Sequence, residues 1–262
     1  MANPILDLPA YVHPWSTLFE LACRTKDPTS WRLGGGLMVQ VHAMLHSMDA
    51  RPTTDADLLV DVLTHAHAVR EVSGSLSRLG FSVQVSTLSG YTTRMRNGDF
   101  EVDLLVDNHL SKPLRERALL KGHPMLGMPG SRRAVMRSVL VDLRYGERCA
   151  TMCIPDLLGA LLMKAAAFRE GGGSGRERHL MDAALLASMI DRPEIELLRL
   201  DNRSRSDRKN VRTLIAGLLG PDAYEYTEYL TDEQIAQERA VILEFSRLLE
   251  MPRKHGHTAD YA

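Results

Sequence analysis

Two aspartates, Asp55 and Asp57, are separated by one alanine at the start of the apolar run DLLVDVL. In a β-strand, residues i and i+2 face the same side, so these two carboxylates can jointly bind a divalent cation. Without a cation, two acids on one face would repel each other. A lone pair of this kind also fits a simpler alternative, in which Asp55 ends a turn after RPTT and Asp57 caps the strand in water.

A third candidate carboxylate lies in the run DFEVDLLVD. Its alternation predicts a strand with Asp103 on the same face as Glu101 and Asp107, and with four apolar residues on the other face. Asp103 lies among apolar neighbours, where an unpaired carboxylate is costly, whereas Glu101 and Asp107 near the strand ends reach solvent more easily. Three carboxylates on adjacent strands can hold Mg²⁺ against a nucleoside triphosphate and activate an attacking hydroxyl.

Three consecutive glycines, Gly34 to Gly36, precede a predicted helix. Glycine lets the backbone approach a phosphate chain because it has no Cβ, and the first turn of a helix supplies N–H donors. Alone, a glycine-rich turn before a helix is also an ordinary capping feature. Together with the three carboxylates, it indicates nucleotidyl-transfer chemistry.

One lysine and one aspartate interrupt apolar helices in the second half of the chain. Lys164 lies in PDLLGALLMKAAAF, which is apolar almost all round, and Asp182 lies in LMDAALLASMI. A buried ammonium needs a negative partner, and a triphosphate would serve. The alternatives are that Lys164 extends to water or pairs with Asp182 structurally.

These motifs together resemble the DNA polymerase β-like nucleotidyltransferase superfamily. Within it they are most similar to the AbiEii-type nucleotidyltransferase toxins of bacterial toxin–antitoxin and phage-defence systems, including the mycobacterial ones. The matching residues around the first predicted strand are Gly35, Gly36, Arg51, Thr53, Asp55 and Asp57. Those of the later helical motif are Lys164, Arg178 and Asp182. One departure is Leu37, where many relatives carry Ser or Thr after the glycine pair.

The resemblance implies transfer of an NMP from an NTP to an acceptor hydroxyl, with Mg²⁺ as the cofactor. Asp55 and Asp57 would bind the metal, and Asp103 would complete the carboxylate set and act as the general base. The 3′ end of tRNA is the leading acceptor. A co-expressed antitoxin protein would restrain the resulting growth inhibition.

The resemblance also implies a nucleotide-binding set. Gly35 and Gly36, with Arg51 or Thr53, would hold or shape the phosphate end. Lys164 would neutralise charge on the leaving pyrophosphate. Asp182 would position that lysine or the nucleotide, and Arg178 would lie at the nucleotide as well.

Two other functions use the same residues. A nucleotidyltransferase acting on a small molecule such as an aminoglycoside shares every acid and differs on the acceptor side. A nucleotide-binding protein of this fold without turnover is a third possibility, against which the joint presence of the acids and Lys164 argues. The segment Arg203 to Arg212 carries five positive charges against one acid and could bind an RNA backbone, or could be an ordinary solvated face.

Composition limits the class of protein. The chain has 262 residues, 44% of them hydrophobic and 25% charged, which is enough for one large or two small domains. A net charge of -1 argues against a protein that coats nucleic acid non-specifically. No run approaches about 18 uninterrupted apolar residues, and no basic start precedes an apolar N-terminal core. We therefore expect a cytoplasmic protein with no membrane partner.

Cysteine and histidine spacing does not predict a zinc site. We expect Cys23, Cys149 and Cys153 to be free thiols, with the last two buried, because no second pair of ligands completes a site. His42 and His46 have the i, i+4 spacing of some zinc sites. No third ligand is evident, so we interpret both as core or surface histidines.

Periodicity divides the chain into a mixed sheet domain, residues 1–154, and a helical domain, residues 155–262. In the first, helices near 15–26, 37–48 and 67–80 accompany strands near 31–33, 57–63, 81–86, 91–97 and 100–106, with a hairpin turn at Asn97-Gly98. A strand pair, 134–143 and 148–154, completes it. Helices follow near 155–169, 178–190, 194–199, 207–219 and 232–249, the last opening with Thr231 and Gln234 at capping-box spacing.

The expected fold class is therefore α/β (α+β). On the resemblance, it would be a polymerase-β-like nucleotidyltransferase mixed sheet domain followed by a helical bundle domain that closes the nucleotide cleft.

Overall fold

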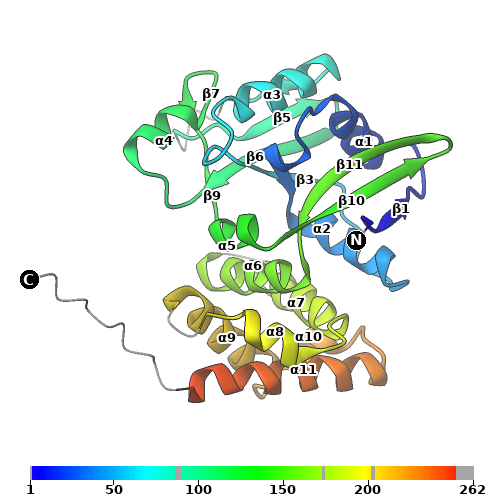
Figure 1. The fold of residues 1–262 in the computed structure, drawn as a ribbon, viewed down its shortest axis with the longest axis vertical. Coiled ribbons are helices and arrows are strands. Elements are labelled where there is room, and N and C mark those ends of the chain that lie inside the picture. The colour runs from blue at the N-terminus through cyan, green and yellow to red at the C-terminus, as the bar shows by residue number, and fades with distance from the viewer. Residues whose placement is uncertain (1, 86–89, 173–174, 202–203, 252–262) are drawn as a thin grey trace, which may run out of the picture. The chain divides into compact units, whose positions relative to one another are not determined.

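The computed structural model describes residues 2–85, 90–172, 175–201 and 204–251. Within these residues the protein is a mixed α/β protein, which confirms the predicted class at that level (Figure 1). The chain divides into two compact units, Met1–Met163 and Lys164–Ala262. The division falls inside a helix, beyond the boundary expected after residue 154.

The first unit is built around a sheet with the strand order β2-β3-β6-β5-β4, in which β9 also pairs with β6. These strands are β2 (Trp31–Leu33), β3 (Ala56–Val60), β4 (Ser82–Val83), β5 (Arg94–Asn97), β6 (Phe100–Asp107) and β9 (Gly127–Met128). The central strands β3 and β6 run parallel. The predicted hairpin is confirmed, because Asn97 pairs with Phe100 and Gly98 takes the left-handed φ of 59° that a tight turn needs.

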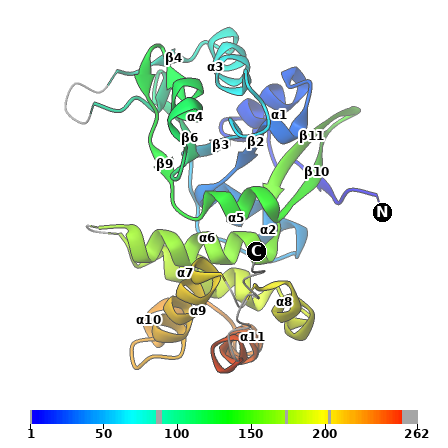
Figure 2. The ribbon, with the colours of Figure 1, turned by 60° about the vertical axis from the view of Figure 1, so that its left-hand side comes forward.

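The first unit also contains helices, of which α3 (Ala68–Arg78) shows the apolar periodicity of the sequence most clearly. The others are α1 (Trp15–Arg24), α2 (Gly35–Leu45), α4 (Lys112–Arg117) and α5 (Ser131–Met136), with the 3-10 turn η1 (Pro28–Ser30). Val69, Val72 and Leu76 are buried at helical spacing on α3. This face packs toward β3, and α3 also lies beside α1 (Figure 2).

A second sheet has the order β1-β10-β11. Its strands are β1 (Ile5–Asp7), β10 (Ser138–Tyr145) and β11 (Arg148–Pro155), and the last two form the long ribbon visible in Figure 1. The prediction of a strand from residue 134 is wrong, because residues 131–136 form α5. Gly130, with a φ of 74°, turns the chain into that helix, and Ala134 packs in a cluster with Leu59 and Met128. A small hairpin, β7 (Leu119–Leu120) with β8 (His123–Pro124), completes the unit.

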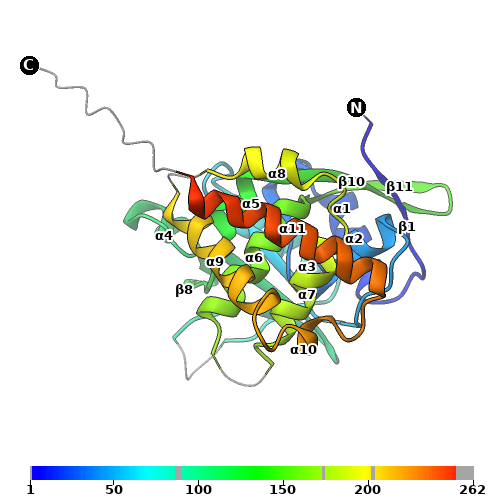
Figure 3. The same ribbon diagram turned by 90° about the horizontal axis from the view of Figure 1, so that it is seen from below.

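The second unit consists of helices. The residues of α6 (Leu157–Glu170) after Met163 lead into α7 (Arg178–Ser188), α8 (Pro193–Arg199), α9 (Arg205–Leu218), α10 (Tyr224–Thr227) and α11 (Asp232–Glu250). The helix α11 packs against α7, α8 and α9 (Figure 3). Its predicted capping box is confirmed, because the Thr231 and Gln234 side chains each accept a backbone N–H of the other residue. None of the helices among the described residues is both long and apolar enough to cross a lipid bilayer.

Candidate functional site

The glycine turn before α2 packs directly on the strand that begins at the acidic pair. The backbone N–H of Gly34 donates to the carbonyl oxygen of Asp57 at 2.7 Å. Gly35 has a φ of +61°, and a Cβ there would lie 1.9 Å from Oδ2 of Asp57. Any larger residue at this position would therefore displace the carboxylate. The first turn of α2 and Asp57 therefore pack directly against each other.

The structure also brings the predicted residues Arg51 and Thr53 to this turn. A Cβ at Gly36 would lie 2.8 Å from Cγ2 of Thr53 and 3.2 Å from Nη2 of Arg51. The side-chain amide of Gln40, on α2, donates to the carbonyl oxygen of Arg51 at 2.9 Å and so ties this loop to the helix. Four of the predicted nucleotide-binding residues thus lie in one place.

Asp57 and Asp103 are register partners in the parallel pair β3 and β6. Residues paired in this way face the same side of a sheet, so the two half-buried carboxylates are neighbours. Asp55 lies just before β3 and is exposed. Asp57 and Asp103 therefore lie side by side on one face of the sheet, and Asp55 directly precedes the strand that carries Asp57.

An arginine that the sequence analysis did not select binds Asp103. Arg94 donates from Nε and Nη2 to the two carboxylate oxygens of Asp103, each at 2.9 Å, and its Nη1 lies 2.5 Å from Oε2 of Glu101. These hydrogen bonds from Arg94 to Asp103, and secondarily the charges of Glu101 and Asp55, raise the pKa of Arg94. The hairpin register could have identified Arg94, because the turn at Asn97-Gly98 places it opposite Asp103.

A histidine from the N-terminal segment lies beside the loop that carries Asp55. The His13 ring stacks on Phe100 with centroids 4.3 Å apart, and its Nε2 lies 3.2 Å from the carbonyl oxygen of Thr54. Burial lowers the pKa of His13, and both its bond to Thr54 and the charge of Asp55 oppose that shift. No local pattern in the sequence indicates this contact, because the partners come from distant segments.

The carboxylates of Asp55, Asp57 and Asp103 are of the ligand type that the predicted cation, Mg²⁺, prefers. Carboxylate oxygens are the ligands that Mg²⁺ prefers, and it commonly takes one or two of them from protein and others from substrate phosphates. Gly35 leaves a space against Oδ2 of Asp57 that a Cβ would fill. In the described part of the chain, no group of three or more His, Cys, Asp and Glu side chains is placed to hold a metal ion. Asp57 and Asp103 thus form the pair around which a cation would bind.

The prediction that Asp107 reaches solvent is wrong. Its side chain is buried, and its Oδ1 accepts the backbone N–H of His109 at 2.7 Å. The reason is that β9 pairs with the end of β6, with Met128 opposite Asp107. The end of the strand is therefore covered.

In the second unit, Lys164 and Asp182 form a buried ion pair. The Nζ of Lys164 donates to Oδ2 of Asp182 at 2.7 Å, and the two side chains are 5% and 3% exposed. This is the structural pairing considered as an alternative to a triphosphate partner. Arg178, at the start of α7, is exposed. These three residues belong to the second unit, whereas the glycines and the other acids belong to the first.

The basic segment from 203 to 212 is partly structural. Arg208 is buried and donates to the carbonyl oxygens of Leu248 and Leu249 at 2.8 and 2.9 Å. A cation at this position satisfies carbonyls at the end of α11 and complements the helix dipole. Because Arg208 is buried, it neither binds RNA nor forms part of a solvated face. Arg203 lies outside the described residues.

The pairing and burial of the cysteines and of His42 agree in part with the sequence-based predictions. All three cysteines are free, but Cys149 is exposed rather than buried because it lies near the turn of the β10–β11 ribbon. His42 is a core histidine, as expected, with Nε2 2.9 Å from the carbonyl oxygen of Pro155. Burial lowers the pKa of His42 to about 4, so it is neutral at pH 7.

Comparisons of this chain with protein-family models, with curated proteins and with solved structures gave no match. A functional proposal therefore depends on the geometry of the site and on the motif resemblance.

Proposed function

We propose that this protein is a Mg²⁺-dependent nucleotidyltransferase that moves an NMP from an NTP to an acceptor hydroxyl. The observation that carries the proposal is the packing of the glycine turn on Asp57, with Asp103 paired beside it. A turn at a helix N-terminus supplies N–H donors for phosphate, and adjacent carboxylates supply ligands for a divalent cation. Nucleotidyl transfer requires both within one site.

In this proposal, Asp57 and Asp103 would hold Mg²⁺ from adjacent strands, and Asp55 would add a third carboxylate from the residue before β3. The bound metal would neutralise phosphate charge and act as a Lewis acid. The N–H groups at the start of α2, with Arg51 and Thr53, bind and orient the triphosphate.

Proton transfer and bond exchange complete the proposed reaction. Asp103, oriented by Arg94, accepts the proton of the acceptor hydroxyl as that oxygen forms a bond to the α-phosphorus. The bond from the α-phosphorus to the bridging oxygen breaks, and pyrophosphate leaves.

For the acceptor we propose the 3′ end of tRNA, and for the biological role the toxin of a toxin–antitoxin system with a cognate antitoxin protein. Both follow from the motif resemblance. A small-molecule acceptor would use the same acids and turn, so the choice between the two depends on an assay that supplies each acceptor.

The decisive experiment is incubation of the purified protein with Mg²⁺, total tRNA and each labelled NTP in turn. We expect labelled tRNA from the unchanged protein and none from Asp57→Asn. Asp99→Asn is the matched control, because it removes an exposed acid from the turn between β5 and β6 in the same unit. It should label tRNA normally.

Three results would change the proposal. Label on an aminoglycoside but not on tRNA would assign a small-molecule acceptor. Nucleotide binding without pyrophosphate release, with every acceptor supplied, would identify a protein that binds nucleotides without turnover. Equal labelling by the unchanged protein and by Asp57→Asn would contradict the proposed site.

A further inference from the structure

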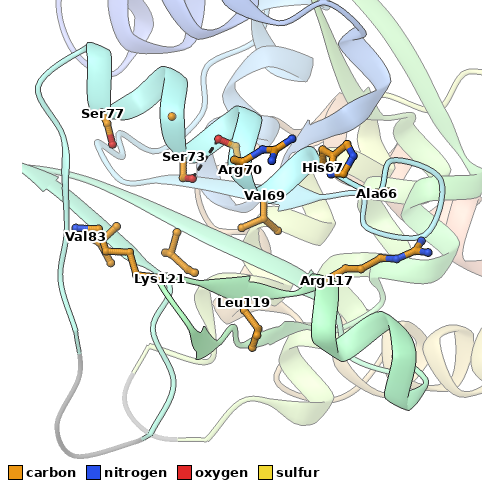
Figure 4. A pocket seen from close by; sticks show the side chains of 12 residues that line it. Ala66, His67, Val69, Arg70, Ser73, Ser77, Val83, Arg117, Leu119 and Lys121 are labelled. Carbon is orange, nitrogen blue, oxygen red and sulfur yellow. Dashed lines mark hydrogen bonds between the residues drawn. The ribbon is translucent and has the colours of Figure 1, made fainter.

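A basic pocket of about 390 Å³ lies in the first unit between α3 and the segment from Arg117 to Lys121. Figure 4 shows His67 and Arg70 on the side formed by α3 and the loop before it, and Arg117, Leu119 and Lys121 on the opposite side. A volume of this order suits a small molecule or one unit of a polymer. None of the residues assigned to the candidate site lines this pocket.

The pocket gathers positive charge without a compensating acid. Arg70, Arg117 and Lys121 line it together with His67, and no Asp or Glu is among its lining residues. In the part of the chain that the structure describes, these three cations form no ion pair. Cations held around one cavity repel each other, so an anion that enters would be bound favourably.

The fold holds the two sides of the pocket in place. Val69 is buried next to Arg70, which fixes the face that α3 turns toward the pocket. On the other side, Leu120 is buried and anchors β7, and Lys121 has a left-handed φ of 49° in the turn before β8. The cations are therefore carried by ordered elements on both sides.

The chemistry of the lining suits phosphate groups. Arginine presents a planar fork of donors that matches phosphate oxygens, and Ser77 adds a hydroxyl donor, whereas the Ser73 hydroxyl donates to the carbonyl oxygen of Arg70. The apolar side chains of Val69 and Leu119 offer a surface for the sugar or base that accompanies a phosphate in a nucleotide. We infer that this pocket is a binding site for nucleotide phosphate groups, carried either by an RNA backbone or by a free polyphosphate.

The pocket lies in the same unit as the candidate site, and most of its lining residues follow β3 and β6 in the chain. Asp55 and Asp57 lie at the start of β3, whereas His67 and Arg70 follow its end. Arg117 and Lys121 likewise follow the end of β6, which carries Asp103. Phosphate binding in the pocket does not itself require transferase activity.

The test is binding, measured in EDTA so that the proposed metal site is not occupied. The probes are a fluorescein-labelled single-stranded RNA, followed by anisotropy, and inorganic triphosphate, followed by calorimetry. The pocket variant is Arg70→Glu/Arg117→Glu. The matched control is Arg78→Glu/Arg132→Glu, which changes the net charge equally at exposed positions of α3 and α5 outside the pocket. Thermal unfolding of both variants confirms that they are folded.

We expect the pocket variant to bind at least one probe about tenfold more weakly than the control variant does. For RNA, the slope of log K against log salt should become shallower by about 0.7 for each phosphate that the variant no longer neutralises. Loss of RNA binding assigns the site to a nucleic-acid backbone, and loss of triphosphate binding alone assigns it to a free polyphosphate. Equal weakening in both variants, or unchanged binding in both, would overturn the inference, whatever the transfer assay shows.

Discussion

A Cβ atom on Gly35 would lie 1.9 Å from Oδ2 of Asp57. The glycine and the carboxylate therefore depend on each other, because the carboxylate can keep its place beside Asp103 only while residue 35 has no side chain. In the proposed site, this contact joins the phosphate-binding turn to the metal-binding carboxylates, and the substitution of Gly35 by alanine tests it.

Gly35→Ala should abolish tRNA labelling while the protein still folds. The added methyl displaces the carboxylate of Asp57, and the left-handed φ of 61° adds roughly 1–2 kcal/mol of backbone strain. Gly98→Ala is the matched control, because Gly98 has a φ of 59° and nothing within 4 Å of its Cβ position. Both variants should lose stability in urea unfolding through the backbone strain, Gly35→Ala more than Gly98→Ala because its methyl also displaces a carboxylate, and only Gly35→Ala should lose labelling. Equal labelling by the two would contradict a functional role for this contact.

Arg94→Met should reduce the rate of transfer with little effect on stability. Removing Arg94 leaves Asp103 without the two hydrogen bonds that orient it, and losing such a supporting partner typically lowers activity about 10–100-fold. The Arg94 side chain is 46% exposed, so its ion pairs contribute only about 1 kcal/mol or less to folding. Arg96→Met is the control, because Arg96 is 50% exposed and pairs with Glu101 rather than Asp103. Similar rates for the two variants would show that Asp103 does not need Arg94.

Lys164→Met should destabilise the protein by roughly 3–5 kcal/mol, because it leaves the carboxylate of Asp182 buried without its cation. The double variant Lys164→Met/Asp182→Leu should recover most of that loss, since no buried charge remains at the pair. Denaturant unfolding of the single and double variants measures the difference. Tests of transfer should use the stable double variant, and full activity there would contradict the catalytic roles that the motif resemblance implies for both residues.

Because of the buried carboxyl group of Glu238, the free energy of unfolding should decrease as the pH rises through the weakly acidic range. Its side chain is fully buried, and neither carboxylate oxygen has a hydrogen-bond partner in the described part of the chain. Burial raises its pKa from 4.5 to about 7. The folded state therefore holds the proton more tightly than the unfolded state does. The free energy of unfolding should decrease by up to roughly 3 kcal/mol between about pH 4.5 and 7, and level off above that.

Urea unfolding across this pH range, compared with Glu238→Gln, isolates the contribution of Glu238. The neutral amide should flatten the decline. Glu233→Gln removes an exposed carboxylate from the same helix, α11, and should leave the decline unchanged. A decline that persists in Glu238→Gln would assign the effect to another group.

Elements whose signals lie within a few neighbouring residues could be predicted from the sequence. The buried stripe of α3 repeats at helical spacing, the capping box at Thr231 and Gln234 marks the start of α11, and Asn97-Gly98 marks the hairpin. The glycine turn, with Arg51 and Thr53 near it, was predicted as a group and is a group in the structure. These features depend on backbone conformation and side-chain period, which nearby residues largely determine.

Features that join distant segments could not be predicted in this way. Residues 134–136 were predicted as the start of a strand, yet they belong to the helix α5, in which Ala134 packs against Leu59 and Met128. The strand β1 has only three residues and is defined by its pairing with β10. The contact of His13 with Thr54 likewise joins segments that no local pattern connects.

The order of amino acids alone specified the reactive groups: an acidic pair and a third acid on predicted strands, a glycine turn before a helix, and a lysine and an aspartate on apolar helices. Folding in three dimensions selected their partners. It paired Asp57 with Asp103 across β3 and β6, bound Asp103 to Arg94, and joined Lys164 to Asp182. Local propensity acts over a few residues, whereas burying a charge requires a partner that only packing between distant segments can supply.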